Sequence, residues 1–479
     1  MEKAYVKVAK FMKNSKLIEL LKTFDANEWR QFEAFVASPY FNSNENLIQL
    51  GAFLGKYAPD FSSAALTKEK AYQAVFPGIP FDARQMGYLM NYMIQLAEEF
   101  ISIQHYRGQS LQVKVDILAE YSRRELEKHY NFLYRKTKEE LDVAMSDLNQ
   151  FEYQYSLAKV ASQHFIRQRV RSFDPTLQNA VNALDDFYFL QKLRFSIEML
   201  NRQAIVSTNY ELSFIDEVQG YLSAQKERLP LIDIYLHIYL SLANDSDERF
   251  AKLIQLIELH SEHIEEAEKR LIYLYAINFC ARKIRQGKDE YVPIVLTLYL
   301  RGIRDRSLFE DEYLSHWTYT NVVKLFLRQK EFEQAEAFIK MYSDNLSPQS
   351  REDALHFNLA ELYYQKEEYG EVLSHLSQLN FSDLFYHMGS RTVLIKTYYE
   401  SEEIESLLSL LASFSNFLRR NKKIAPGLKK TYLNFCNLLF NILKNNPKKR
   451  DRIKEEIQRT QPLAERSWLL KVWGEQGKY

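Results

Sequence analysis

The chain has 479 residues, with 63 Lys and Arg against 63 Asp and Glu, and only 13 glycines and 11 prolines. The length exceeds what one hydrophobic core usually holds, so we expect several units or an elongated repeat. The scarcity of Gly and Pro disfavours an all-β or loop-rich α/β fold, and the balanced charge gives no argument for nucleic acid or an anionic membrane as partner.

Residues 1–108 are predicted to form an N-terminal domain of four or five short helices. Apolar residues recur at helical spacing, and the helices are separated by residues that favour helix starts. Asp25 with Glu28 three positions later has the spacing of a capping box, and so has Asp82 with Gln85. We therefore expect helices to begin after both aspartates, the second of them a long one.

The stretch Ser38–Asn44 reads SPYFNSN and separates two of these helices. Its proline ends the first helix, and Asn42 or Asn44 can cap the next. Tyr40 and Phe41 lie just before this cap, where an apolar residue packs against the first turn of the following helix. We favour this packing role over the alternative, an exposed recognition loop.

Residues 109–179 are predicted to be a helical connector built from two longer amphipathic helices. Near its end, the sequence HFIRQRVRSFDP carries a small basic patch. Arg167 and Arg171 are four positions apart and would share one face of a helix. A solvated helix face explains such a pair more simply than a phosphate site does.

Residues 180–415 contain an internal repeat. Three segments align without gaps, and each has a helical pattern, a polar turn of four residues (RQKE, QKEE or ESEE) and a second helical pattern. The segments are residues 320–339, 357–376 and 392–411. The second helices are predicted to begin at the apolar residues Phe332, Tyr369 and Ile404.

This pattern resembles the tetratricopeptide repeat, most closely in the middle segment. There Leu359, Ala360 and Tyr363 stand where the family has Leu-Gly-x-x-Tyr, and Tyr369 opens the second helix. The resemblance is clear over 318–412. It implies an α–α superhelical solenoid that binds a partner protein or peptide in a groove lined by the first helices.

Polar or aromatic positions of the first helices that lie off the apolar stripe are the candidate partner-binding residues. They are Asn321, Lys324, Asn358, Glu361 and Lys396. Each of them is equally well explained as an ordinary solvated side chain.

Residues 416–479 are predicted to form a basic helical cap, with Trp468 and Trp473 as packing anchors. From Ser415 onward the chain has 16 basic and five acidic residues, an excess of 11 positive charges. Such a region can bind phosphates, or it can dock on the acidic remainder of the molecule. The candidate basic patch is Arg419, Arg420, Lys422, Lys423, Lys429 and Lys430.

The sequence offers little support for catalysis. It contains no GxGxxG, GxxxxGK[ST] or GxSxG motif, and Cys280 and Cys436 lie within apolar helical patterns. His260, His263 and Glu266 have a spacing that could bind zinc on one helical face, but surface histidines are the simpler interpretation. We therefore predict no catalytic residue, no cofactor and no metal.

The lysines scattered through the first 16 residues leave no uninterrupted apolar segment for export, and no apolar run approaches the length of a membrane span. We predict a cytoplasmic, all-α protein without membrane insertion. Its expected role is that of a non-catalytic scaffold, in which the solenoid groove holds a protein or peptide. The alternative is a nucleic-acid-associated regulator that uses the basic C-terminal region.

Overall fold

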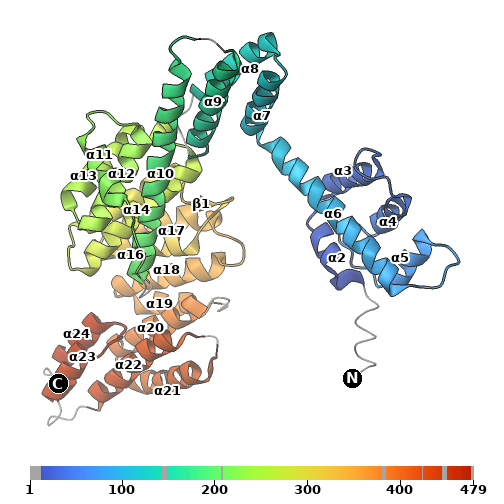
Figure 1. Ribbon diagram of the computed structural model, residues 1–479. Coiled ribbons are helices and arrows are strands. Elements are labelled where there is room, and N and C mark those ends of the chain that lie inside the picture. The colour runs from blue at the N-terminus through green and yellow to red at the C-terminus, as the bar shows by residue number, and fades with distance from the viewer. Residues whose placement is uncertain are drawn as a thin grey trace. The chain divides into compact units, whose positions relative to one another are not determined.

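The computed structural model describes residues 12–142, 148–169, 171–205, 209–379, 384–422, 424–444 and 450–475. Helices dominate this part of the chain (Figure 1). Its strands are one short antiparallel pair, β1 (Phe309–Glu310) and β2 (Tyr313–Leu314). The prediction of an all-α fold is confirmed.

The chain divides into two compact units. Unit 1 comprises Met1–Met145 and Asn149–Phe187, and unit 2 comprises Ser146–Leu148 and Tyr188–Tyr479. The division between Phe187 and Tyr188 falls inside one long helix, a position with no linker-like composition. The predicted boundaries at 108, 179 and 415 stay predictions.

Unit 1 contains a first group of short helices and a second group of longer ones. The helices of the first group are η1 (Met12–Asn14), α2 (Lys16–Leu21), α3 (Ala26–Ala37), α4 (Glu45–Gly55), α5 (Lys68–Val75) and α6 (Ala83–Gly108). Those of the second are α7 (Ser110–Arg123), α8 (Glu127–Asp142), α9 (Leu148–Arg167) and the first part of α10 (Pro175–Ile205).

The helices α2 to α5 pack against the long helix α6 (Figure 1). Phe100 of α6 lies at the centre of this packing: its ring centroid is 5.5 Å from those of Phe24 and Phe32 and 5.6 Å from that of Phe35. All four rings are buried. Burial of large aromatic side chains therefore stabilises the first group of helices.

The two predicted capping boxes have different outcomes. Asp25 accepts a hydrogen bond from the backbone N–H of Glu28, and the Glu28 side chain accepts one from the backbone N–H of Asp25, so the first box is confirmed. Asp82 caps α6 as predicted. Gln85, however, accepts a hydrogen bond from the hydroxyl of Tyr72 at 2.6 Å. The Gln85 side chain therefore bonds to α5 instead of completing the second capping box.

Hydrogen bonds made by the side chains of two asparagines, Asn42 and Asn44, fix the conformation of the SPYFNSN loop. Asn44 caps α4, and the Asn42 amide donates to the carbonyl of Val36 at 2.8 Å. Phe41 stacks on Phe35 of the preceding helix, with ring centroids 4.1 Å apart, whereas Tyr40 is 88% exposed. The predicted packing role is wrong for Tyr40, and Phe41 contacts the helix before the loop.

The connector has three helices, α7 to α9, rather than the predicted two. The break between the two predicted helices, after Leu126, agrees with the end of α7, where Glu125 has a φ of 60° and Leu126 donates to the carbonyl of Tyr121. The division that was not predicted separates α8, which ends at Asp142, from α9, which begins at Leu148. The sequence between them, VAMSD, contains no glycine or proline that would indicate a break. Because α9 ends at Arg167, Arg171 does not share a helix with it, which corrects the predicted basic face.

Unit 2 continues with helices from the second part of α10 to the C-terminus. The first are α11 (Ile215–Ala224), α12 (Pro230–Asn244), α13 (Asp247–His260), η2 (Ser261–His263), α14 (Glu266–Arg285) and α15 (Tyr291–Arg304). Next come α16 (His316–Arg328), α17 (Phe332–Tyr342), η3 (Ser343–Asn345), α18 (Arg351–Gln365), α19 (Tyr369–Leu376), α20 (Leu384–Glu400) and α21 (Ile404–Arg420). The last are α22 (Pro426–Leu443), α23 (Arg450–Arg459) and α24 (Arg466–Glu475).

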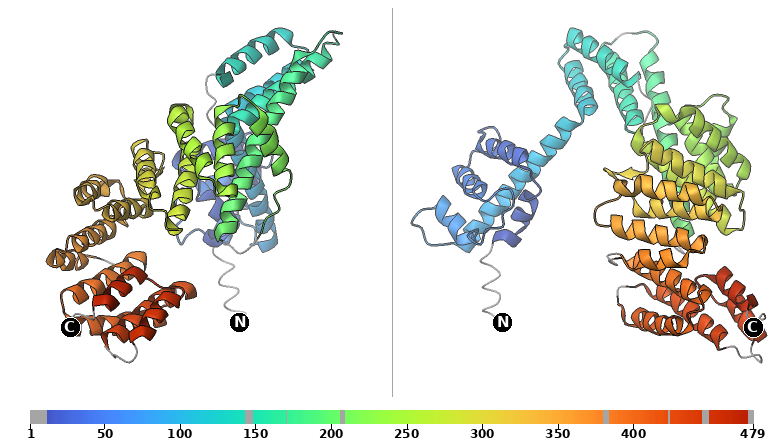
Figure 2. Two further views of the ribbon diagram at one scale, coloured as in Figure 1. Left: turned by 90° about the vertical axis from the view of Figure 1, so that its left-hand side faces the viewer. Right: turned by 180° about the vertical axis from the view of Figure 1, so that it is seen from behind.

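Successive helix pairs pack on one another along unit 2. The pairs are α12 with α13, α14 with α15, α16 with α17, α18 with α19, and α20 with α21. Figures 1 and 2 show them following each other in chain order. The first helices α16, α18 and α20 are direct neighbours, as are α12 and α14. Each hairpin thus covers an apolar face of the next.

The last three aligned turns share one backbone conformation. Lys330, Glu367 and Glu402, the third residues of RQKE, QKEE and ESEE, have φ values of 59°, 63° and 60°. In each turn the next residue donates a backbone hydrogen bond across the helix end, at 2.9 to 3.0 Å, as in a Schellman motif. The second helices begin at Phe332, Tyr369 and Ile404, as predicted.

The helices α22, α23 and α24 form a cluster with α21. Trp468 is buried in this cluster and Trp473 packs against it, so their predicted role as packing anchors is confirmed. Cys280 and Cys436 are buried as free thiols. Burial raises the pKa of Cys280 to about 12 and that of Cys436 to about 11, which keeps both protonated at neutral pH.

A buried lysine joins the hairpin α12–α13 to α14. Lys283 of α14 is buried, and its Nζ lies 3.0 Å from Asp245 Oδ1 and 2.6 Å from Asp247 Oδ1. Lys288 approaches Asp247 from the other side, at 2.6 Å. Hydrogen bonds from the two lysines hold the pKa of Asp247 well below its ordinary range.

Replacing Asp247 with asparagine is expected to lower the stability of unit 2 by about 1 kcal/mol at neutral pH, because half of the carboxylate is exposed to water. A depressed carboxyl pKa stabilises the fold above the ordinary pKa, about 3.9, and this contribution is lost as the pH falls toward the folded-state pKa. The difference in urea midpoint between the wild type and Asp247→Asn should therefore shrink below about pH 4. Glu227→Gln, in an exposed loop, is the control, and a difference that stayed constant down to acid pH would contradict the ion-pair role.

Candidate functional site

The outward face of α16 carries a tryptophan and two of the predicted partner-binding residues. One side of α16 is buried, through residues Tyr319, Val322, Val323 and Phe326. The opposite side, at positions 317, 321 and 324, therefore faces outward. On this face lie Trp317, Asn321 and Lys324, all exposed. We call these three residues the α16 face.

Phe385 of α20 extends the α16 face, and a buried ring of α18 lies close to it. The Trp317 ring lies 4.3 Å from the ring of Phe385 on α20. Lys324 Nζ lies 5.6 Å from the centre of the Phe385 ring and 6.0 Å from that of Phe357 on α18. Trp317 is nevertheless 49% exposed. The helices α16 and α20 thus present an aromatic surface with a cation beside it, and the buried ring of Phe357 lies next to that cation. This arrangement suits a peptide with apolar or aromatic side chains.

The structure separates the five predicted partner-binding residues into accessible and buried ones. Asn321 and Lys324 are exposed, and Asn321 donates to the hydroxyl of Tyr299 at 3.3 Å. Glu361 is half-buried. Asn358 is 0% exposed and Lys396 is 6% exposed, so neither side chain is available to a partner. The prediction is corrected for these two residues.

Both buried residues take part in contacts between helices. The Asn358 amide donates to the carbonyl of Ala354 at 2.7 Å and to Oγ1 of Thr320 on α16 at 3.1 Å. Lys396 Nζ lies 3.1 Å from Glu465 Oε2 and 4.7 Å from the centre of the Tyr364 ring. A polar residue on a first helix can therefore be a tertiary contact, which its sequence position does not reveal.

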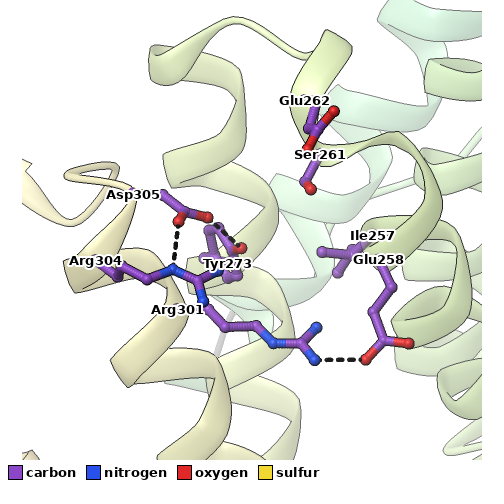
Figure 3. Close-up of a pocket in the computed structure, with 8 residues that line it drawn as sticks. All are labelled: Ile257, Glu258, Ser261, Glu262, Tyr273, Arg301, Arg304 and Asp305. Atoms are coloured by element: carbon purple, nitrogen blue, oxygen red, sulfur yellow. Dashed lines mark hydrogen bonds and ion pairs between the residues drawn. The ribbon is translucent and has the colours of Figure 1, made fainter.

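A pocket with a volume of about 370 Å³ lies between α13, η2, α14 and α15 (Figure 3). It is lined by Ile257, Glu258, Ser261, Glu262, Tyr273, Arg301, Arg304 and Asp305. In Figure 3, Arg301 and Glu258 point toward each other across one side, where their ion pair measures 2.8 Å. Arg304 lies 3.1 Å from Asp305.

Both arginines of this pocket are paired with acidic residues, whereas Glu262 at its edge has no ion-pair partner within the described residues. Tyr273 donates to Asp305 at 3.4 Å, and burial together with this carboxylate raises the pKa of Tyr273 to about 12. The phenol therefore stays protonated and the two arginines stay neutralised. Such a pocket can hydrogen-bond a polar chain, but neither arginine offers an uncompensated positive charge to select an anion.

The predicted basic patch lies at the end of α21 and the start of α22. Arg419, Arg420, Lys422 and Lys430 are exposed, and Lys429 is half-buried. Lys423 lies outside the described residues. The exposed side chains among them are accessible to an anion in solution. They lie close to the junction between α21 and α22.

A hydrogen-bonded Ser–His–Glu chain occurs in unit 1. His164 Nδ1 lies 3.0 Å from Ser122 Oγ, and His164 Nε2 lies 3.2 Å from Glu127 Oε2. Arg167 also donates to Ser122 Oγ, and Tyr130 stacks on the imidazole at 3.6 Å. Ser122 is only 4% exposed. These contacts join α7, α8 and α9 and leave the hydroxyl no open side for a substrate.

The residues considered for zinc do not share one helical face. The helix α13 ends at His260, His263 ends the short helix η2, and Glu266 begins α14. Within the described ranges no group of three or more His, Cys, Asp or Glu side chains is placed to hold a metal ion. Among the helices described, none combines the length and apolar character needed to cross a bilayer.

No protein-family model and no curated protein matches this chain.

Sequence reasoning missed Trp317 and Phe385. Trp317 precedes Asn321 by four positions and Lys324 by seven, so the spacing that selected those two residues also selects the tryptophan. It lies before residue 320, where the first aligned segment begins, and the candidate positions therefore exclude it although aromatic residues qualify. Phe385 carried no such signal, because only the packing of α20 on α18 brings it to the α16 face.

Proposed function

We propose that unit 2 is a tetratricopeptide-like array that binds a protein or peptide partner at the α16 face, in a non-catalytic role. Support comes from the successive hairpins, their matched turns and the adjacent first helices. The single observation that carries the proposal is the half-exposed Trp317 beside Phe385 and Lys324. Tryptophan is enriched among the residues that dominate binding energy at protein interfaces.

Replacing Trp317 with alanine is expected to weaken partner binding by about 2 kcal/mol or more, roughly 30-fold, because the partner loses its aromatic anchor. Lys324→Glu should also weaken binding, since it reverses the charge beside the aromatic rings. The tagged wild type and both variants would be used to capture partners from nuclease-treated lysate of the source cells. Mass spectrometry identifies the partner, and titration of the purified partner then measures the dissociation constant.

Met341→Ala is the matched control, because Met341 is exposed on α17, the second helix of the same hairpin. Equal urea midpoints would show that all the variants are folded. Capture of the same partners at the same level by the wild type and by Trp317→Ala would refute the α16 face as the binding site. A parallel capture from untreated lysate tests the alternative. Partners found in the untreated lysate but absent after nuclease treatment would support the nucleic-acid alternative instead.

A further inference from the structure

The α20–α21 hairpin has an uneven distribution of charge. Its acidic residues Glu400, Glu402, Glu403 and Glu405 gather at the turn that joins the two helices. No Asp or Glu occurs in residues 384–399, nor in residues 406–450. Because α20 and α21 run antiparallel, the start of α20 lies beside the end of α21. The open end of the hairpin is therefore basic and carries no acidic side chain from the described residues of α20 and α21; Asp383, which precedes α20, lies outside the described residues.

An open pocket of about 520 Å³ lies at this end of the hairpin. It is lined by Ser413, Asn416, Phe417, Arg420 and Asn421, all from the end of α21 and the residue after it. Arg391 of α20 reaches the same place, because its NH1 donates to Ser413 Oγ at 3.5 Å. Two guanidinium groups, a hydroxyl and two amides thus border one depression.

Arg391 is held in position without a carboxylate. Its Nε donates to His387 Nε2 at 3.4 Å, and the His387 ring packs on Phe417 with centroids 4.2 Å apart. Burial lowers the pKa of the Arg391 guanidinium, and within the described residues no acidic side chain pairs with it. Arg420 is exposed and makes no ion pair in that part of the chain. Both positive charges are consequently available to an incoming anion.

We propose that the open end of the α20–α21 hairpin, formed by Arg391, Ser413, Asn416 and Arg420, binds a carboxylate or phosphate group on an acidic segment of a protein partner. This rests on the proposed function, because it takes the partner to be a protein. Guanidinium groups match the geometry of both anions with paired hydrogen bonds, and the serine and asparagine add neutral donors.

The geometry favours an acidic peptide over a nucleic acid. Base stacking needs an accessible ring, and the ring in this pocket, Phe417, already packs on His387. A single-stranded nucleic acid also needs a basic track along several phosphates. The pocket instead concentrates two arginines at one point, which suits one or two anionic side chains.

Fluorescence anisotropy with the full-length chain tests the site. The probes are a labelled glutamate-rich peptide, the same peptide with phosphoserine at the central positions, a glutamine-for-glutamate version and a single-stranded oligonucleotide. We expect both acidic peptides to bind and the glutamine peptide not to bind. The acidic peptide with the lower dissociation constant indicates whether the partner carries a carboxylate or a phosphate group. Arg420→Gln should weaken binding about tenfold, which corresponds to the loss of one charge-assisted contact.

Arg84→Gln removes one exposed charge from α6 in unit 1 and should leave binding unchanged. Arg391→Gln is a second variant of the site, but Arg391 is half-buried and its replacement can impair folding. Arg420 makes no hydrogen bond or ion pair within the described residues, so Arg420→Gln tests the site without that complication.

The proposal is overturned if neither acidic peptide binds, or if Arg84→Gln and Arg420→Gln weaken binding equally. It is also overturned if the oligonucleotide binds more tightly than both peptides and depends on Arg420. Capture through Trp317 is measured separately, so failure of the acidic site alone leaves the proposed function standing.

Discussion

Replacing Phe357 with alanine is expected to lower the free energy of unfolding of unit 2 by about 3–5 kcal/mol, the usual cost of removing a buried phenylalanine ring. Phe357 is 1% exposed, and its ring lies 5.9 Å from that of Phe385 and 5.3 Å from that of Tyr386, both on α20. The substitution leaves a cavity between α18 and α20. Urea unfolding followed by circular dichroism measures the loss as a lower midpoint.

Phe195→Ala is the control, because Phe195 is largely exposed on α10, and a change within about 0.5 kcal/mol is expected for it. Gly389→Ala tests the same contact from the other side. A Cβ at Gly389 would lie 2.8 Å from Cε2 of Phe357, so the added methyl should destabilise the wild type. Phe357→Leu should relieve that clash. Equal effects of Gly389→Ala in both backgrounds, or a Phe357→Ala midpoint close to the wild-type value, would contradict this packing.

Replacing Lys396 with alanine is expected to destabilise unit 2 by about 3 kcal/mol, because it leaves the half-buried Glu361 and Glu400, and the more exposed Glu465, without their buried cation. Burial by itself would lower the pKa of Lys396, but Glu361, Glu465 and Glu400 reverse this effect and leave the pKa raised. Glu400 also accepts hydrogen bonds from Trp468 Nε1 at 3.2 Å and Lys471 Nζ at 3.1 Å. The lysine thus helps to hold α24 against α20, and the urea midpoint measures its contribution.

Lys396→Met keeps most of the aliphatic stem on Tyr364 and removes only the charge, so its cost should be smaller than that of Lys396→Ala. Adding Glu465→Gln should recover part of the loss, because both members of the pair are then neutral. Lys340→Ala, which breaks an exposed pair with Glu336, is the control and should cost less than about 0.5 kcal/mol. Losses that simply add in the double variant would refute a direct Lys396–Glu465 interaction.

The exposure expected of the candidate residues is observed where it follows from helical periodicity and is not observed where neighbouring helices cover the side chain. Asn321 and Lys324 lie opposite the buried side of α16, so spacing alone places them outward. Asn358 lies on α18, a helix covered by α16 and α20 together, and its amide is buried between them. Amphipathic spacing describes one covered side, whereas an interior helix has more than one.

By itself, the amino-acid sequence determined the helical class, the Asp25 capping box and the first residues of α17, α19 and α21. These features depend on side chains within a few positions of one another, so local spacing is sufficient to specify them. Only the tertiary structure decided that Lys396 is paired with a glutamate 69 residues later, that Gln85 serves Tyr72, and that Arg391 meets the end of α21. Contacts of this kind depend on which helices become neighbours, and that is set by the burial of apolar faces summed over the whole unit.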